Sequence, residues 1–427
     1  MTAFLIIPFF LALLGGIPIA FSLALGVVCA IVFASRFPIE VLANNMYAAT
    51  ASFPLMAVPF FLLAGELMNR TGITTRLLRF VVVLVGRMHG GLGHSMVLTG
   101  TIFAGLSGSG AADTAALTKI MAPGMAKEGY PISYSAGLAA ATGVLGPIIP
   151  PSICMIVYGA LMNVSVGTMF MAGIMPGLLL AGGLMAMNSY MARKHHFPKC
   201  EDPFSFKELW VSFKGASLAL LMPIFILYAI RGGICTPTEG GSLAAVYALF
   251  LGVVVYRTLS FKDCLDSLVA AGITSAVVLL VVGAATPFGW LLSVNRIPQE
   301  VATFILGLTQ NKYVVLLLFN VLLLIMGMLL ETNAIILLLA PILAPVAVSL
   351  GVHPIHFAVV MIVNLCIGLA TPPVGMTLFV GASAAGITVE RVIKQALPFV
   401  AVELVVLMVI TYIPEVILCI PRALGMI

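Results

Sequence analysis

Long hydrophobic runs, separated by short polar segments, are the dominant pattern along this chain. Such runs occupy residues 4–34, 80–106, 132–162, 166–192 and 267–294, among others. A helix needs roughly 20 apolar residues to cross the hydrocarbon core of a bilayer, and several runs reach that length. The pattern therefore predicts an all-α polytopic membrane protein. Composition excludes a soluble domain, because 62% of the 427 residues are hydrophobic and only 8% are charged.

Two of the apolar runs are interrupted near their centres by paired prolines. The first contains Gly146-Pro147-Ile148-Ile149-Pro150-Pro151, and the second contains Gly368-Leu369-Ala370-Thr371-Pro372-Pro373. Proline has no amide hydrogen to donate, and lipid offers no substitute donor. The pattern predicts two broken helices. In membrane transporters, discontinuous helices at corresponding places in two halves usually mark a binding site.

The two breaks belong to an internal repeat. They lie 222 positions apart, and the same offset aligns other residues without a gap. Matches of glycine are common by chance in such a composition, whereas matched prolines at four separate positions are not. The polar stretch Arg193–Lys214 lies between the halves. The aligned pairs are Gly105 and Gly327, Pro123 and Pro345, Gly146 and Gly368, Pro150-Pro151 and Pro372-Pro373, and Pro176 and Pro398.

A helical hairpin is expected before each break, near residues 97–125 and 314–348. The first half of the first hairpin, Met96–Leu106, is too short to span a bilayer. We therefore expect both hairpins to be re-entrant, with polar tips at residues 107–110 and 331–333. Most of the 20 lysines and arginines then share one side, as the positive-inside rule requires of the cytoplasmic side. This topology inverts the second repeat, and the cations left outside are Arg36, Arg231, Arg296, Lys312 and Arg422.

The proline breaks should release backbone oxygens within the membrane. In an α-helix the carbonyl of residue i accepts from the amide of residue i+4, so each proline frees the carbonyl four positions earlier. An unsatisfied carbonyl is costly in hydrocarbon, and water or a cation could bind it. The carbonyls expected to be free are those of Gly143, Gly146 and Pro147 in the first break, and of Gly368 and Leu369 in the second.

The hairpin tips add further oxygen ligands and helix ends. In each hairpin the first half ends in carbonyls, which favour cations, and the second half begins with amides, which favour carboxylates. Hydroxyls are available from Ser107, Ser109, Thr332 and Thr371. This oxygen-only set suits sodium and argues against zinc or copper.

Two acidic residues lie close to the tips. Asp113 lies in an apolar run, where ionisable residues are functional by default. It could also simply cap the second half-helix, or do both. Glu331 allows the same alternatives, with solvation of the tip as its structural role. An intramembrane enzyme that uses both acids is disfavoured, because the two hairpins are expected to enter from opposite faces.

The residues of the first tip and the second break resemble those of a known family. Gly105-Leu-Ser-Gly-Ser-Gly-Ala-Ala-Asp113-Thr and Gly368-Leu-Ala-Thr-Pro-Pro-Val-Gly375 are similar to the large membrane subunit of tripartite ATP-independent periplasmic (TRAP) transporters, the DctM/SiaM type. These belong to the ion transporter superfamily. The resemblance covers essentially the whole chain and looks closest to the sialic-acid branch.

The resemblance implies an elevator mechanism, in which a transport domain slides against a fixed scaffold. Scaffold helices are then expected in residues 1–72, 166–295 and 389–427. Connecting helices are expected in residues 73–95 and 296–312, and the two transport-domain halves in residues 96–165 and 313–388. The implied location is the bacterial inner membrane.

The resemblance also implies ligands and partners. Two or more sodium ions are expected, together with an organic acid, a small four-helix membrane subunit and a periplasmic substrate-binding protein. The implied first sodium site is Ser107, Ser109, Asp113, Gly143, Gly146 and Pro147. The implied second sodium site is Gly327, Thr332, Gly368 and Thr371. The substrate is expected between the tips, at Ser109, Gly110, Thr332 and Asn333.

A self-sufficient sodium–dicarboxylate carrier of the same superfamily is the alternative. It would need neither a binding protein nor a small subunit. No arginine lies at either tip to clamp a second carboxylate, which favours a polyhydroxylated monoacid as the substrate.

Overall fold

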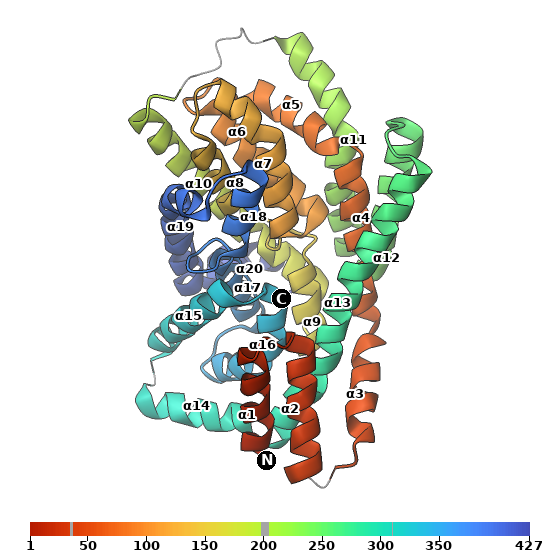
Figure 1. Cartoon of the computed structure of the whole chain (residues 1–427), viewed down its shortest axis with the longest axis vertical. Coiled ribbons are helices and arrows are strands. Elements are labelled where there is room, and N and C mark those ends of the chain that lie inside the picture. Colours follow the sequence, from red (N-terminus) through yellow and green to blue (C-terminus); the bar gives the residue numbers. More distant parts are fainter. Residues whose placement is uncertain (35–36, 198–204, 310) are drawn as a thin grey trace.

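The computed structural model describes residues 1–34, 37–197, 205–309 and 311–427 (Figure 1). Arg36 and the 198–204 part of the polar stretch between the halves lie outside this range. Within these described ranges, seven helices are long and apolar enough to cross a membrane. The number rises to eight if the bent pair formed by α3 (Glu40–Thr50) and residues 53–70 is one span, with a bend of 57°.

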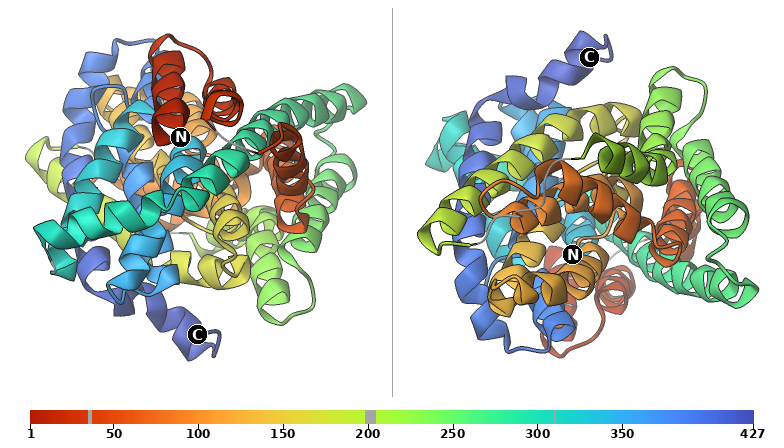
Figure 2. Two further views of the ribbon diagram at one scale, coloured as in Figure 1. Left: turned by 90° about the horizontal axis from the view of Figure 1, so that it is seen from below. Right: turned by 90° about the horizontal axis from the view of Figure 1, so that it is seen from above.

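A framework of helices occupies the right-hand and lower parts of Figure 1. In it α4 (Ala57–Arg70) packs against α12 (Pro237–Phe250) and α13 (Phe261–Val294). The long α13 crosses the molecule obliquely when seen from below (Figure 2) and also contacts α2 and α3. The remaining members are α1 (Thr2–Leu14), α2 (Ile19–Ala34), α5 (Ile73–Val85) and α11 (Phe206–Arg231), with the short segments η1 (Phe53–Met56) and η2 (Leu251–Val255).

The first hairpin consists of α6 (Gly91–Ser107) and α7 (Gly110–Lys127). Gly108 turns the chain with φ of +62°, a left-handed conformation that glycine adopts without strain. The expectation that the first half spans only Met96–Leu106 is wrong, because α6 begins at Gly91. Its polar first turns are buried against α10 (Val166–Lys194), where His94 and Ser189 form a 3.1 Å hydrogen bond.

The second hairpin consists of α15 (Lys312–Leu329) and α16 (Thr332–Ser349). Both helices have 18 residues and are apolar enough to span a membrane by length and composition. Re-entrance of the two hairpins stays a prediction. Their arrangement is clear in Figure 1, where α6 and α7 lie in the upper half of the molecule and α15 and α16 in the lower half.

Both predicted helix breaks are present. The first separates α8 (Ile132–Gly143) from α9 (Ile153–Met162), and the second separates α17 (Pro354–Gly368) from α18 (Met376–Ala385). The Pro-Pro peptide bond of each break is cis. Ser152 ends the first break by capping α9, where its hydroxyl accepts from the amide of Met155 at 3.2 Å.

Four of the five carbonyls expected to be free have found other donors, so this expectation was largely wrong. Tight turns satisfy two of them, because Gly146 N donates to Gly143 O at 3.1 Å and Thr371 N donates to Gly368 O at 3.0 Å. Polar side chains satisfy the others. Ser152 donates to Pro147 O, and Thr377 donates to Leu369 O at 2.9 Å. Only the Gly146 carbonyl has no donor among the described residues.

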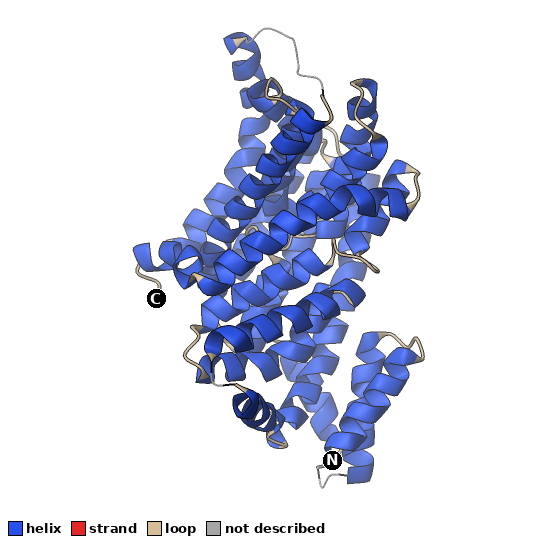
Figure 3. Ribbon diagram, turned by 90° about the vertical axis from the view of Figure 1, so that its left-hand side faces the viewer, coloured by secondary structure: helices blue, strands red, loops and turns tan. Residues whose placement is uncertain are grey.

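The other helices surround the hairpins and breaks. On the left of Figure 1, α10 and α19 (Val389–Tyr412) pack against α8 and α17, and α20 (Pro414–Ala423) packs against α10. The lower α14 (Ile297–Leu308) contacts α16. Figure 3 shows helices and loops, with no strand in the described residues. The predicted all-α polytopic fold is therefore confirmed.

Candidate functional site

The first hairpin tip lies directly against the first break. Asp113 is only 1% exposed, and its Oδ1 accepts a hydrogen bond from the Ser107 hydroxyl. Its Oδ2 has no partner among the described residues. A Cβ added to Gly146 would lie 2.6 Å from this oxygen, so the unpaired oxygen faces the break. An unpaired buried carboxylate oxygen is costly, which makes this position a candidate for an added cation.

Glycines allow this close contact between tip and break. A Cβ on Gly143 would lie 2.1 Å from Thr114 Oγ1 and 2.6 Å from Gly110 O. A Cβ on Gly110 would lie 2.7 Å from Gly143 O and 3.6 Å from Pro147 Cδ. The backbone of the tip therefore meets the backbone of the break with no room for a side chain. The sequence had placed no weight on Thr114, whose hydroxyl donates to Gly110 O at 2.8 Å.

Ser109 has a structural role at the same tip. Its hydroxyl caps α7 by accepting from the amide of Ala112 at 3.4 Å, and its own amide donates to Ser107 Oγ at 3.2 Å. The structure thus brings all six residues of the expected first sodium site to one tip–break contact. Whether they bind sodium stays a prediction.

The second tip lies against the second break in a similar way. A Cβ on Gly368 would lie 2.6 Å from Gly327 Cα, so these two backbones are in direct contact. The Thr371 hydroxyl donates to Ile367 O at 2.7 Å. Thr332 Oγ1 is buried, at 2% exposure, and has no hydrogen-bond partner among the described residues. Gly327 and Gly368 therefore form the second tip–break contact, Thr371 lies in the break that follows Gly368, and Thr332 begins the second helix of the hairpin.

The donor set fits a hard monovalent cation. Among the oxygens of the two expected sodium sites, Asp113 Oδ2, Thr332 Oγ1 and the Gly146 carbonyl have no partner within the described residues. Other carbonyls at the breaks have a second lone pair to offer. Within the described ranges, no three His, Cys, Asp or Glu side chains gather as metal ligands. Hydroxyls, one carboxylate and backbone carbonyls are what the site provides, and sodium prefers such oxygens.

A cavity of about 300 Å³ lies between the two tips. Ser109 and Gly110 line it from the first hairpin, and Thr332 and Asn333 line it from the second, so the four residues predicted to bind substrate share one cavity. Of the described residues that line it, Glu331 alone is charged. The remaining lining residues are Ile19, Leu62, Gly108, Ala111, Pro147, Ile153, Cys154, Thr274, Val277, Val278, Val281, Ala334, Leu369 and Met376.

The sequence did not reveal the third wall of this cavity. Thr274, Val277, Val278 and Val281 come from α13, far from both tips along the chain. Nothing in the apolar pattern of α13 distinguishes a cavity-facing residue from a lipid-facing one. Cys154 also lines the cavity, and no motif in the sequence marks it.

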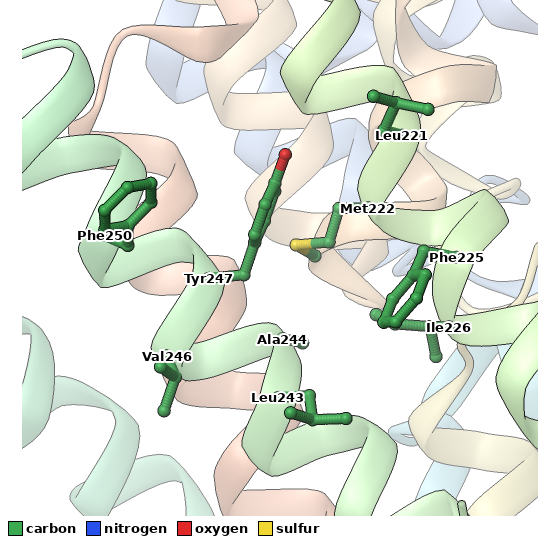
Figure 4. Close-up of a pocket in the computed structure, with 9 residues that line it drawn as sticks. All are labelled: Leu221, Met222, Phe225, Ile226, Leu243, Ala244, Val246, Tyr247 and Phe250. Carbon is green, nitrogen blue, oxygen red and sulfur yellow. The ribbon is translucent and has the colours of Figure 1, made fainter. Parts of the chain in front are cut away.

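A second cavity, of about 530 Å³, lies between α11 and α12 and is apolar throughout (Figure 4). Phe225 projects into it from α11, and Leu243 and Tyr247 from α12. The Tyr247 hydroxyl is already used, because it donates to Leu218 O at 2.8 Å. None of the described residues that line this second cavity is charged or has a free polar group. The cavity therefore offers no ligand for an ion or an organic acid.

The fold and the cavity between the tips define a membrane transport protein. Residues 6–416 match the family model described as "Tripartite ATP-independent periplasmic transporter, DctM component", and the chain belongs to this family. It is therefore a multi-pass subunit of a transporter of the bacterial inner membrane, and not an enzyme.

Curated relatives agree with this assignment. The chain is 38% identical over 413 residues to the sialic acid TRAP transporter large permease protein SiaM of Vibrio cholerae, covering 96% of each chain. It is 40% identical over 405 residues to the C4-dicarboxylate large permease protein DctM of Pseudomonas aeruginosa, covering 95% of each. It is also 40% identical over 408 residues to the isethionate permease protein DctMQ of Oleidesulfovibrio alaskensis, covering 96% of this chain but only 64% of that protein.

A solved structure shares the fold. The transporter YdaH of Alcanivorax borkumensis superposes with a TM-score of 0.61, covering 87% of this chain and 86% of that one. The sequence identity is 17%, so this similarity concerns the fold alone.

Proposed function

We propose that this chain carries an organic acid into the cell together with sodium ions, after a periplasmic binding protein has delivered the acid. One observation carries the proposal: two hairpin tips, each packed on a broken helix, flank a single cavity. Asp113 and Thr332, which lie in the first turns of α7 and α16, each carry a buried oxygen with no partner among the described residues. Each contact can therefore bind a cation while the cavity between them binds the acid.

The chain's own residues explain why ions and substrate would bind together. A cation between Asp113 Oδ2 and the first break would hold α7 against α8, and so fix Ser109, Gly110 and Ala111 at the cavity wall. The second contact would fix Thr332 and Asn333 in the same way. Binding of ions would then pre-organise the surface that meets the acid, which lowers the entropy cost of binding it.

The ion gradient supplies the driving force. Each net positive charge moved across 100 mV contributes roughly 2.3 kcal/mol. Two sodium ions carried with a monovalent acid move one net charge inward, and the sodium concentration gradient adds to this. The substrate is an acid of the kind named for the relatives, which include sialic acid, isethionate and C4-dicarboxylate permeases.

Two protein partners complete the proposed transporter. The family description names a tripartite system, and the name DctMQ is given to a relative that is longer than this chain. We place a small four-helix membrane subunit on the framework helices, with the lipid bilayer around both. The periplasmic binding protein docks on the side opposite the positively charged loops.

We also propose an elevator motion, with one amendment to the division expected from the sequence. That division assigns residues 166–295 and 389–427 to the scaffold. However, α10 packs against α6 and α19, and α19 packs against α8, α17 and α18. These contacts favour placing α10 and α19 with the hairpins in the moving part, against a scaffold that keeps α4, α11, α12 and α13.

Reconstitution into liposomes tests the proposed function. Uptake of the acid should require an inward sodium gradient, the small subunit and the binding protein loaded with that acid. Uptake that persists without sodium would refute sodium coupling. Uptake of free acid without the binding protein would instead favour the self-sufficient carrier.

A further inference from the structure

We propose that Glu331 makes this transporter select acids that carry a hydrogen-bond donor, a hydroxyl or an ammonium, at the end opposite the acidic group. The same carboxylate would then discriminate against dicarboxylates. This inference rests on the proposed function, because it assumes that the cavity between the tips is where the acid binds. It begins from a difference between the two tips.

The two helix N-termini at the cavity are capped differently. At the first tip the cap of α7 is the neutral hydroxyl of Ser109, and the amides of Gly110 and Ala111 have no acceptor among the described residues. At the second tip the cap of α16 is the carboxylate of Glu331, whose Oε2 accepts from the amide of Ala334 at 3.1 Å. Helix N-termini attract anions. The N-terminus of α7 remains available to an anion. The N-terminus of α16 does not, because the carboxylate of Glu331 already neutralises its partial positive charge.

The second tip has spare acceptors in place of spare donors. Glu331 Oε1 accepts from the side-chain amide of Asn333 at 2.8 Å. The backbone amide of Asn333 also donates to this carboxylate. Since a carboxylate offers about four lone-pair sites, at least one remains for a ligand. Thr332 Oγ1 and Asn333 Oδ1 are buried and have no partner among the described residues. All three residues line the cavity, and Glu331 is the one charge there.

These observations orient the substrate. Its acidic group meets the amides of Gly110 and Ala111, and its far end meets the oxygens of Glu331, Thr332 and Asn333. A hydroxyl or an ammonium can donate to those oxygens. A second carboxylate cannot donate, and its negative charge would be repelled by that of Glu331.

Matched pairs of ligands test the inference. We would measure sodium-dependent binding to the purified full-length chain with its small subunit, by isothermal titration calorimetry. Each pair differs only in whether the far end is a donor or a carboxylate: 4-hydroxybutanoate with succinate, isethionate with sulfoacetate, and gluconate with glucarate. A fourth ligand, 4-aminobutanoate, separates an ammonium from a hydroxyl.

The wild-type protein should bind the donor-bearing member of a pair at least tenfold more tightly. Glu331→Gln should reduce this ratio to about threefold or less, mainly by strengthening binding of the diacid. The glutamine keeps one side-chain oxygen to cap Ala334, so the hairpin should remain folded, and an unchanged melting temperature would verify this. Glu300→Gln, an exposed acid in the first turn of α14, is the matched control and should leave the ratio unchanged.

Each outcome decides the question. Equal or tighter binding of the diacid by the wild-type protein, in the presence of sodium, would overturn the inference and leave the proposed function standing. A donor preference that survives Glu331→Gln would overturn the role of Glu331. Absence of sodium-dependent binding by every ligand would contradict the proposed function itself, and the inference with it.

Discussion

Asp113 is the residue with the strongest case for binding a cation. It lies in an apolar helix, is almost fully buried, and uses one carboxylate oxygen for Ser107 while the other has no partner among the described residues. A capping role, the alternative considered from the sequence, belongs instead to Ser109. A buried carboxylate that neither caps a helix nor pairs with a base needs a cation or a proton.

Asp113→Asn tests this residue. The amide has nearly the same shape and keeps an oxygen for the Ser107 hydroxyl, but it removes the charge that attracts a cation. The sodium concentration for half-maximal uptake should rise at least tenfold, which corresponds to about 1.4 kcal/mol of binding free energy. Asp266→Asn is the control, because that carboxylate lies at the surface beside Arg70. An unchanged sodium dependence in Asp113→Asn would assign Asp113 to packing.

Glu403 is a second buried carboxyl, on α19, and no motif in the sequence singles it out. It is fully buried, and neither oxygen has a hydrogen-bond partner among the described residues. Such a group costs stability unless something else binds it. Glu403→Met should therefore raise the melting temperature, by an amount equivalent to about 1 to 3 kcal/mol, the usual cost of leaving a buried polar group unsatisfied.

The control for this prediction is Glu390→Met in the exposed first turn of the same helix. It should leave the melting temperature unchanged. If Glu403→Met instead lowers the melting temperature, Glu403 has a stabilising partner, such as a bound cation, and is not an unsatisfied buried acid.

At the scale of helices, glycine pairs determine how closely each tip approaches its break. Gly143 and Gly110 meet in the first contact, and Gly327 and Gly368 meet in the second. The internal repeat in the sequence already aligned Gly105 with Gly327 and Gly146 with Gly368. It could not show which glycine touches which, because that depends on how α7 packs against α8.

Gly143→Ala tests the first contact. The added methyl group would lie 2.1 Å from Thr114 Oγ1 and 2.6 Å from the Gly110 carbonyl, so the hairpin must shift away from the break. We expect lower affinity for sodium and a lower melting temperature. Gly124→Ala in α7 is the control, since its methyl group would meet nothing within 4 Å. It should be neutral or slightly stabilising, because alanine favours helix by roughly 0.5–1 kcal/mol. Equal effects of the two substitutions would contradict the close tip–break contact.

The sequence predicted the helical elements well and their local hydrogen bonds poorly. Prolines and glycines at fixed offsets located both breaks and both tips, because these residues act on the backbone directly. The beginning of α6 was missed, since His94 is polar yet buried against α10. The number of free carbonyls was overestimated. The rule that each proline frees the carbonyl four positions earlier does not consider side-chain donors, and Thr377 and Ser152 supply such donors.

At the scale of the molecule, the framework and the hairpins meet along α13 and α16. In this interface a Cβ on Gly289 would lie 3.8 Å from Pro341 Cβ, a separation that suits a disulfide. The division into a fixed framework and a moving hairpin part was predicted from the family resemblance alone, and not from the apolar pattern of the sequence. The surfaces that face each other come from residues distant in the chain, and both surfaces are apolar.

A cross-link between Gly289→Cys and Pro341→Cys, in a background without the seven native cysteines, tests the elevator motion. Oxidation should abolish uptake and reduction should restore it, because the hairpin would be tied to the framework. The control pair is Phe60→Cys with Gly241→Cys, both in the framework, where the corresponding Cβ atoms lie 3.1 Å apart. Oxidising the control pair should not affect uptake. Full uptake with the first pair cross-linked would contradict relative motion at this interface.

We propose that two ion-binding contacts and one acid-binding cavity act as a single site. Binding of the delivered acid to the purified transporter, measured as a function of sodium concentration, tests this coupling. Coupled sites should give a sigmoidal dependence with a Hill coefficient above one. The coefficient should fall towards one in both Asp113→Asn and Thr371→Val, which alter one contact each. Acid binding that does not depend on sodium, or that is unchanged by both substitutions, would contradict this coupling.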